Sequence, residues 1–455
     1  MKNIFKKVVI FVFSTGLFIA CDDLADTNID PGKPGGESVS LVAITPTMQT
    51  QTHRNLLASA GRMAGIFMQQ FQGFDAQQVA FSQYAVNEGT LANFWEFGLY
   101  TGSMRDCADM IERANNQGDV PHTRAVAKIY MAANLGIATN IWGDIPYTEA
   151  FKGADNLSPS YDSQEDIYNS IQNLLDEAIN DLNLPDPQGP LGDLVGANWI
   201  ATAHALKARF YMQLSKRDAN AANKVLSELE LAFDSNGAAP VFEFENTPNG
   251  GNPLALFGVE RPNTLIIGTF FDELMEGDPR REVFMVPNVD GDQLFFENGN
   301  TDLFWAQFNS PSPLISFTEV KFLEAEALAR TNSDALPALQ ASIRANMEYI
   351  GVSAGEIDSY LTSIVQADLE TILVEKYKAL YGSNPIQVWN DFRRTGFPEL
   401  VPNPEGANGS NPSGIVPRRF LYPDSERLAN TEAYEAAIAA QGGHLLDVDL
   451  WAFED

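Results

Sequence analysis

The stretch that decides the fold is residues 123–151, which read TRAVAKIYMAANLGIATNIWGDIPYTEAF. Between residues 123 and 141, apolar side chains recur at intervals of three and four residues, the spacing of one face of an α-helix. Trp142 follows at once, beside a tight turn. The stretch therefore predicts a long helix that ends in a turn, with the Trp142 ring in the core.

The helical spacing recurs along most of the chain. It is found in residues 41–71, 95–114, 167–182, 199–214, 219–233, 317–329, 336–350, 357–381 and 434–440. Ser163 precedes one of these segments and Pro185 follows it, which are ordinary start and stop signals of a helix. We predict an all-α fold in which antiparallel helices pack in pairs.

Two segments interrupt this pattern with dense glycine and proline, residues 238–313 and residues 398–423. Within the first, residues 264–268 (TLIIG) predict a short strand. Long irregular segments in a helical protein usually carry function. We therefore expect both to be functional loops.

The N-terminus has the pattern of a bacterial lipoprotein. A basic start with Lys2, Lys6 and Lys7 precedes 13 apolar residues, and LFIAC at residues 17–21 is typical of a lipobox. The sequence predicts a signal peptide at 1–20, lipid attachment at Cys21, a flexible tether at 21–40 rich in acids, Gly and Pro, and one helical binding domain at 41–455. Acyl chains on Cys21 would anchor the protein to a membrane without a spanning helix.

Charge and cysteine content exclude several classes of protein. The chain of 455 residues carries 29 Lys+Arg against 60 Asp+Glu, a formal net charge of -31, which is wrong for a protein that neutralises nucleic-acid phosphates. Only Cys21 and Cys107 are present, so a disulfide scaffold is excluded. Cys107 lies at helical spacing with apolar neighbours and predicts a buried, inert thiol.

Catalytic and metal motifs are weak. Residues 351–355 (GVSAG) match a nucleophile elbow, but a helix precedes them, and Ser353 with Glu356 predicts a helix-capping box instead. Asn288, Asp290 and Asp292 have the first spacings of a calcium loop without its glycine and final glutamate, so a structural calcium is weakly supported. No cofactor is expected.

Aromatic residues in the loops are the candidates for ligand contact, because exposed rings stack on sugar faces or peptide side chains. The candidates are Phe74, Phe81, Tyr84, Phe295, Phe296, Phe304 and Trp305. Amide side chains near them, which could hydrogen-bond sugar hydroxyls or peptide groups, are Asn87, Asn93, Gln293, Asn298, Asn300 and Gln307. The remaining tryptophans and Tyr100 are expected in the core.

Several segments together carry a family resemblance. They are residues 139–151 (TNIWGDIPYTEAF), 278–281 (DPRR), 286–288 (VPN), 310–313 (SPSP), 319–327 (EVKFLEAEA), 389–396 (WNDFRRTG), 417–423 (PRRFLYP) and 449–451 (DLW). In this order, and with the lipobox, they resemble the SusD/RagB outer-membrane lipoproteins.

The resemblance implies four tetratricopeptide-like helix pairs that support a loop-rich ligand face. It also implies a cell-surface protein that captures an oligosaccharide, or a peptide, and passes it to a SusC-like TonB-dependent barrel transporter. It implies no enzyme activity, and residues 142–147 and 389–396 look like turns that define the fold. Two alternatives stay open: a lipid-anchored helical scaffold without a small ligand, and a glycan hydrolase.

Overall fold

The computed structural model describes residues 39–117, 120–186, 198–295 and 302–454. It divides the chain into residues 1–44 and residues 45–455, and the second unit is the subject here. The predicted signal peptide and Cys21 lie outside the described residues.

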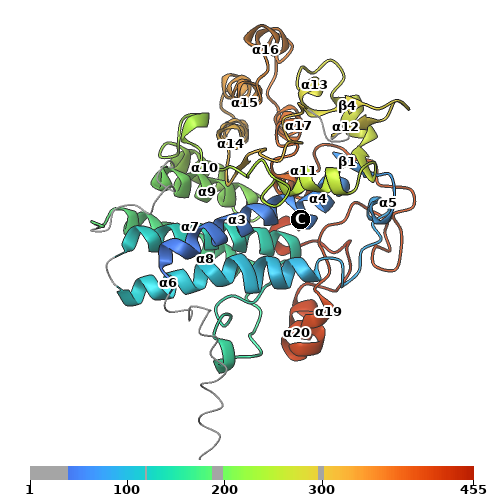
Figure 1. Ribbon diagram of the computed structural model, residues 1–455. Helices are drawn as coiled ribbons and strands as arrows, with labels where there is room; N and C mark the ends of the chain where they lie inside the picture. The colour runs from blue at the N-terminus through green and yellow to red at the C-terminus, as the bar shows by residue number, and fades with distance from the viewer. Residues whose placement is uncertain (1–38, 118–119, 187–197, 296–301, 455) are drawn as a thin grey trace, which may run out of the picture. The chain divides into compact units, whose positions relative to one another are not determined.

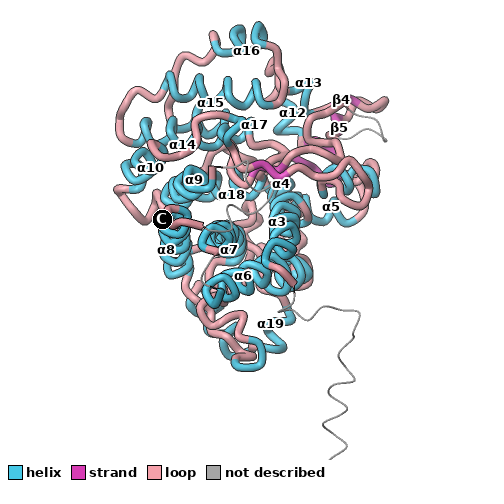
Figure 2. Tube along the Cα trace, turned by 60° about the vertical axis from the view of Figure 1, so that its left-hand side comes forward, coloured by secondary structure: helices cyan, strands magenta, loops and turns pink. Residues whose placement is uncertain are grey.

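Helices dominate the described residues, which confirms the predicted fold class (Figures 1 and 2). The α-helices are α3 (Leu41–Leu57), α4 (Ser59–Phe67), α5 (Gln77–Ser82), α6 (Met104–Gln117), α7 (Pro121–Trp142), α8 (Gln164–Leu182), α9 (Trp199–Gln213), α10 (Ala221–Leu229), α11 (Pro253–Glu260), α12 (Thr269–Leu274), α13 (Arg281–Phe284), α14 (Phe317–Arg330), α15 (Leu336–Tyr349), α16 (Ala354–Leu361), α17 (Leu369–Ala379), α18 (Pro385–Thr395), α19 (Asp424–Ala429) and α20 (Thr431–Ala440). A π-helix, η2 (Phe94–Ser103), and three short 3-10 helices, η3 (Gly153–Asp155), η5 (Asn236–Ala238) and η6 (Trp451–Phe453), complete the helical elements of the described residues.

Consecutive helices pack against one another from α6 through α10, and α14 extends this packing from α10 to α15. The centre of the first group is α7, in which every residue except His122 and Arg124 is buried. A helix that is buried on all sides is surrounded by other elements. This explains why the stretch that ends in Trp142 organises its neighbours.

The turn after α7 fastens the C-terminal loop to the helices. Gly143 has a φ of 88°, and a Cβ atom there would lie 2.6 Å from the Gln441 side chain. The Trp142 indole donates to the Leu421 carbonyl at 3.0 Å, and the Tyr422 hydroxyl donates to the Asp144 carbonyl at 2.6 Å. The turn is therefore specified by glycine and by contacts far along the chain.

Several predicted helix boundaries differ from the structure. The segment 41–71 is two helices that break at residue 58, and 357–381 is interrupted between α16 and α17, where Asp368 caps the new helix. Residues 389–396, expected to be a turn, are mostly the end of α18, which stops at Gly396 with a φ of 81°. The prediction of a turn there was wrong, because only its last residue leaves the helix.

The strands of the described residues form three short antiparallel pairs. The predicted strand is β3 (Leu265–Ile267), and it pairs with β1 (Phe71–Gly73). The other pairs are β2 (Val241–Phe242) with β6 (Ser312–Pro313) and β4 (Val286–Pro287) with β5 (Gln293–Leu294). The β1–β3 pair brings the loop after α4 beside the start of α12.

Candidate functional site

A pocket of about 260 Å³ lies where three distant segments of the chain meet. We call it the amide–aromatic pocket. Its lining consists of Ile66, Gln69, Phe71, Gln72, Ser82, Tyr84, Gly268, Thr269, Phe270, Val401, Pro402, Asn403 and Pro404. Both irregular segments that the sequence marked as functional loops contribute to it, one through residues 268–270 and the other through residues 401–404.

Hydrogen bonds hold the 398–423 loop over the pocket. Asn403 donates its side-chain amide to the Ser82 carbonyl at 2.8 Å, and its backbone N–H donates to the Tyr84 hydroxyl at 3.1 Å. Gln69 donates its side-chain amide to the Val401 carbonyl at 2.7 Å. The wall formed by residues 401–404 is therefore preformed. A ligand that binds there does not have to order this segment, which would weaken its affinity.

The opposite wall depends on close approach of two backbones and on unusual conformations. A Cβ atom at Gly268 would lie 2.0 Å from the Gln69 carbonyl oxygen, so only glycine fits there. Gln69 and Tyr84 have φ values of 57° and 56°, a region that non-glycine residues rarely occupy. Such conformations persist where the surrounding structure holds them and cluster at functional sites.

The pocket has no formal charge. None of its lining residues is Asp, Glu, Lys, Arg or His, and burial raises the pKa of the Tyr84 phenol, which keeps it neutral. The half-buried Phe270 supplies an aromatic ring, and Gln72 and Thr269 are exposed on the rim. This combination of a ring and amides is what recognition of a neutral polar ligand needs.

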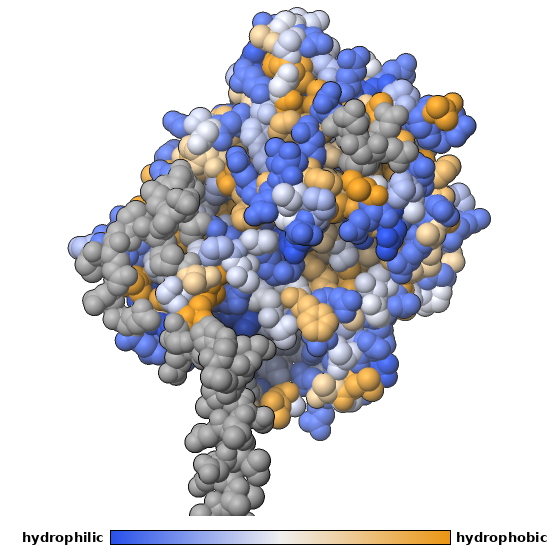
Figure 3. All heavy atoms as spheres, viewed as in Figure 1, coloured by the Kyte–Doolittle hydropathy of each residue, from blue (hydrophilic) through white to orange (hydrophobic). Residues whose placement is uncertain are grey.

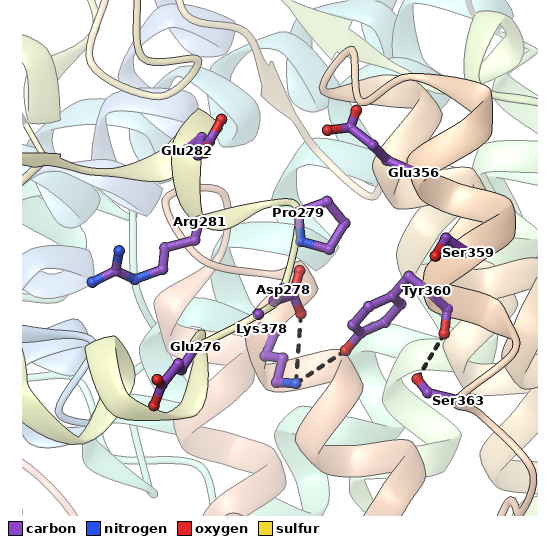
Figure 4. Close-up of a pocket in the computed structure, with 11 residues that line it drawn as sticks. Glu276, Asp278, Pro279, Arg281, Glu282, Glu356, Ser359, Tyr360, Ser363 and Lys378 are labelled. Atoms are coloured by element: carbon purple, nitrogen blue, oxygen red, sulfur yellow. Dashed lines mark hydrogen bonds and ion pairs between the residues drawn. The ribbon is translucent and has the colours of Figure 1, made fainter.

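A second, larger cleft of about 720 Å³ has a different character (Figure 4). Its floor is a network of paired charges: the Lys378 amine donates to the Tyr360 hydroxyl at 3.1 Å and lies 3.5 Å from the Asp278 carboxylate. Arg280, fully buried, pairs with both Asp278 and Glu375 at 2.6 Å. We call it the charged cleft.

Asp278, the buried carboxylate of the charged cleft, is poorly suited to act as a general acid. A general acid needs a raised pKa, whereas Asp278, although burial raises its pKa, is brought to about 2 by Arg280 and Lys378. Burial also raises the pKa of Glu375, but Arg280 and Lys378 lower it below its ordinary value. Burial raises the pKa of Asp106 to about 6 and also raises that of Asp144, but neither lines the two cavities.

The predicted aromatic contacts are placed unevenly. Phe81, Tyr84, Phe295 and Trp305 are buried, with exposures of 6, 2, 3 and 3 %, so in this arrangement their rings offer no open face for stacking. The expectation of exposed rings was wrong for these four, because tertiary packing folds the loops inward. Of the four, only Tyr84 lines a pocket.

The other three candidates differ from these four. Phe74 is 52 % exposed, follows β1 directly and does not line the pocket. Phe304 is half-buried against Trp305 and Tyr349, and Phe296 lies outside the described residues. Ligand contact stays a prediction for the candidate set.

None of the predicted amide residues that the structure describes lines the amide–aromatic pocket. Asn87 accepts hydrogen bonds from Gly89 and Thr90 within its own turn, Gln293 lies in β5, and Asn93 and Gln307 are exposed elsewhere. Asn298 and Asn300 lie outside the described residues. Sequence reasoning missed Gln69, Gln72, Thr269, Phe270 and Asn403, although the Gln-rich run and the strand before Thr269 were visible signals.

The weak catalytic and metal motifs have structural roles. Ser353 and Glu356 form the capping box of α16, as predicted. Asn288 accepts hydrogen bonds from the backbone of Asp290 and Asp292 in the β4–β5 hairpin turn. Within the described ranges, no group of three or more His, Cys, Asp or Glu residues is arranged to hold a metal. Cys107 is buried and free, as predicted.

The surface view shows apolar residues in separate groups among polar ones (Figure 3). The exposed large apolar side chains of the described residues include Phe74, Phe97, Leu157, Val289, Val401 and Leu428. Val401 lies on the pocket wall, and Phe74 lies two residues beyond the lining residue Gln72. In the described part of the chain, no helix has both the length and the apolar character needed to cross a membrane.

Solved structures with the same fold were found. A chitin-binding protein is 22 % identical, with a TM-score of 0.76 over 91 % of this chain and 100 % of that chain. A SusD/RagB family protein from Bacteroides thetaiotaomicron is 24 % identical, with a TM-score of 0.76 over 91 % of this chain and 99 % of that one. A SusD homologue from Bacteroides fragilis is 20 % identical, with a TM-score of 0.72 over 90 % and 99 % of the two chains. At these identities the likeness shows the fold alone.

A comparison with curated protein sequences finds no match. The sequence model of the SusD-like family, described as starch-binding and associating with the outer membrane, matches residues 36–423. This match spans most of the chain and includes every segment of the amide–aromatic pocket. The chain therefore belongs to the SusD-like family.

Proposed function

We propose that the protein is a cell-surface lipoprotein that captures an oligosaccharide in the amide–aromatic pocket and delivers it to a SusC-like TonB-dependent transporter. The observation that carries the proposal is an uncharged pocket with an aromatic wall on a chain of net charge -31. Membership of the SusD-like family supports it, and the lipobox at Cys21 supports a membrane anchor.

The pocket favours capture followed by release. A transport protein must hold its ligand weakly enough to pass it on, and a shallow site with one stacking ring and a few amides gives moderate affinity. Membership of the SusD-like family supports binding without hydrolysis. A peptide ligand stays an alternative, because amides also pair with peptide groups.

The ring of Phe270 gives the sharpest test of capture. We expect Phe270→Leu to weaken binding of the preferred oligosaccharide by about tenfold, because leucine keeps the volume and loses the stacking face. Phe97→Leu is the matched control, since Phe97 is 59 % exposed and does not line the pocket. Calorimetric titration against neutral glycans, anionic glycans and peptides measures both. Equal loss in the two variants, or no glycan binding at all, contradicts capture in this pocket.

Anchoring and delivery are tested separately at Cys21. We expect Cys21→Ser to release the protein from the membrane fraction, because the serine hydroxyl takes no lipid in place of the thiol. We expect the lipidated protein to co-purify with a barrel transporter from detergent-solubilised membranes. Recovery of other partners in membranes without any such barrel would favour the scaffold alternative instead.

A further inference from the structure

This inference rests on the proposed function and makes its ligand more specific. We infer that the amide–aromatic pocket holds one uncharged sugar unit that carries an acetamido group. The argument uses the hydrogen-bonding capacity that the pocket leaves unused, the chemistry of its walls and its size.

Two amide atoms at the pocket are available for a ligand. Gln69 uses its amide nitrogen on the Val401 carbonyl, and its Oε1 atom accepts no hydrogen bond from the described residues. Gln72 uses its Oε1 atom to accept from the Thr269 hydroxyl at 3.4 Å, and its Nε2 atom donates to none of them. The pocket therefore offers one amide acceptor and one amide donor.

An acetamido group complements this pair, because its N–H donates and its carbonyl oxygen accepts. A hydroxyl group can pair with either amide, but it leaves no methyl group to bury. The acetamido methyl would find apolar partners in Ile66, Val401 and Pro402 of the same lining. Burying a methyl group against apolar neighbours is favourable, so both the polar and the apolar part of the group are accommodated.

Charge and size narrow the ligand further. The lining has no ionisable side chain apart from the neutral Tyr84, and Glu405, next to the lining residue Pro404, is exposed. A carboxylate or sulfate on the sugar would find no basic partner in this lining. A volume of about 260 Å³ is below the range of about 300–1,000 Å³ for drug-sized ligands, so one sugar unit fits rather than several.

A peptide carries the same amide chemistry but fits the walls less well. Peptide recognition relies on backbone N–H and carbonyl groups along the ligand. Pro402 and Pro404 form part of the wall and have no N–H to donate. The Phe270 ring, in contrast, suits the apolar face of a sugar. The observations therefore favour an acetamido sugar, and the peptide becomes an outcome of the test.

The experiment titrates the purified protein with four oligosaccharides of equal length by calorimetry. They carry an acetamido group, a hydroxyl group, an amine or a carboxylate at the same ring position, and an acetylated peptide is the fifth ligand. We expect the acetamido oligomer to bind about tenfold or more tightly than the hydroxyl oligomer. If binding of the amine-bearing oligosaccharide disappears as the salt concentration rises, that binding is due to the acidic surface and not to the pocket.

Gln72→Leu tests the donor, and Gln77→Leu is its matched control, because Gln77 is an exposed glutamine outside the lining. We expect Gln72→Leu to abolish the acetamido preference and Gln77→Leu to keep it. Equal binding of hydroxyl and acetamido oligomers, with Phe270 still required, overturns this inference and leaves the proposed function intact. Binding of the peptide alone overturns the sugar assignment, and binding of neither these ligands nor any glycan of the wider panel used for Phe270→Leu overturns the proposed function itself.

Discussion

At the scale of single residues, a buried ion pair contributes to the response to acid. Glu326 is fully buried and accepts hydrogen bonds from Arg394 and Arg330. Burial raises its pKa, but the two arginines outweigh that effect and lower the pKa from 4.5 to about 2. Because the folded-state pKa lies below the unfolded value, the pair stabilises the protein above about pH 4.5, and this contribution is lost as the pH falls toward 2.

We expect Glu326→Gln to lower the free energy of unfolding by about 3 kcal/mol at neutral pH, because the buried Arg394 then keeps only the Asp391 carboxylate of its two ion-pair partners. The difference between the variant and the parent should shrink steadily between about pH 5 and pH 2. Urea unfolding at several pH values measures it. A constant difference over this range would show that Glu326 is not the titrating group.

Variants of Trp305 test whether its ring stabilises the fold or contacts the ligand. It is 3 % exposed and packs so closely on Gly382 that a Cβ atom there would lie 2.5 Å from the indole. We expect Trp305→Ala to lower stability by about 3–5 kcal/mol, and Trp305→Phe to bind oligosaccharide like the parent. Thermal unfolding and calorimetric titration give the two values. Lost binding in a Trp305→Phe protein of unchanged stability would return the residue to the ligand site.

At the scale of elements, α16 shows how a motif gains its meaning from its surroundings. A helix and the turn at Gly351 precede Ser353, and its side chain caps the backbone N–H of Glu356. We expect Ser353→Ala to lower the free energy of unfolding by about 1 kcal/mol, with a change below about 0.5 kcal/mol for the exposed Ser359→Ala. Ester hydrolysis by the parent that disappears in Ser353→Ala would support the nucleophile interpretation and contradict ours.

The elements also show how far sequence patterns reach. Local signals identified the long helices, the caps at Ser163 and Ser353 and the strand at residues 265–267, because each depends on neighbours within a few residues. The break at residue 58 was missed, since apolar spacing continues across it. Helix α18 was also missed, although Asn384 caps its start and Gly396 ends it.

The site could be predicted only in part, for a physical reason. The irregular loops at residues 238–313 and 398–423 were recognisable, and they do form two walls of the pocket. Which side chains face it depends on the pairing of β1 with β3 and on the bonds of Asn403 to Ser82 and Tyr84. Those contacts join residues hundreds of positions apart, so Phe270 and Gln72 could not be distinguished from their neighbours beforehand.

At the scale of the whole molecule, net charge acts on every ligand that approaches. A chain with a formal charge of -31 repels anionic polymers over a distance of about 10 Å at about 0.1 M salt. We expect an oligogalacturonate to bind at least about tenfold more weakly than a neutral oligosaccharide of equal length. The difference in affinity between the two oligomers should decrease as the salt concentration rises, because salt screens the repulsion.

Charge beside the pocket can be separated from charge elsewhere with two matched variants. Glu405 is exposed and adjoins the pocket residue Pro404, whereas Glu432 is exposed on α20 and does not line the pocket. If local charge excludes anions, Glu405→Gln should narrow the gap between anionic and neutral oligomers more than Glu432→Gln does, because Coulomb energy falls with distance. Equal narrowing would assign the effect to the total charge. Tight, salt-insensitive binding of oligogalacturonate to the parent protein would contradict exclusion of anions altogether, because an uncharged pocket has no cation with which to hold a carboxylate.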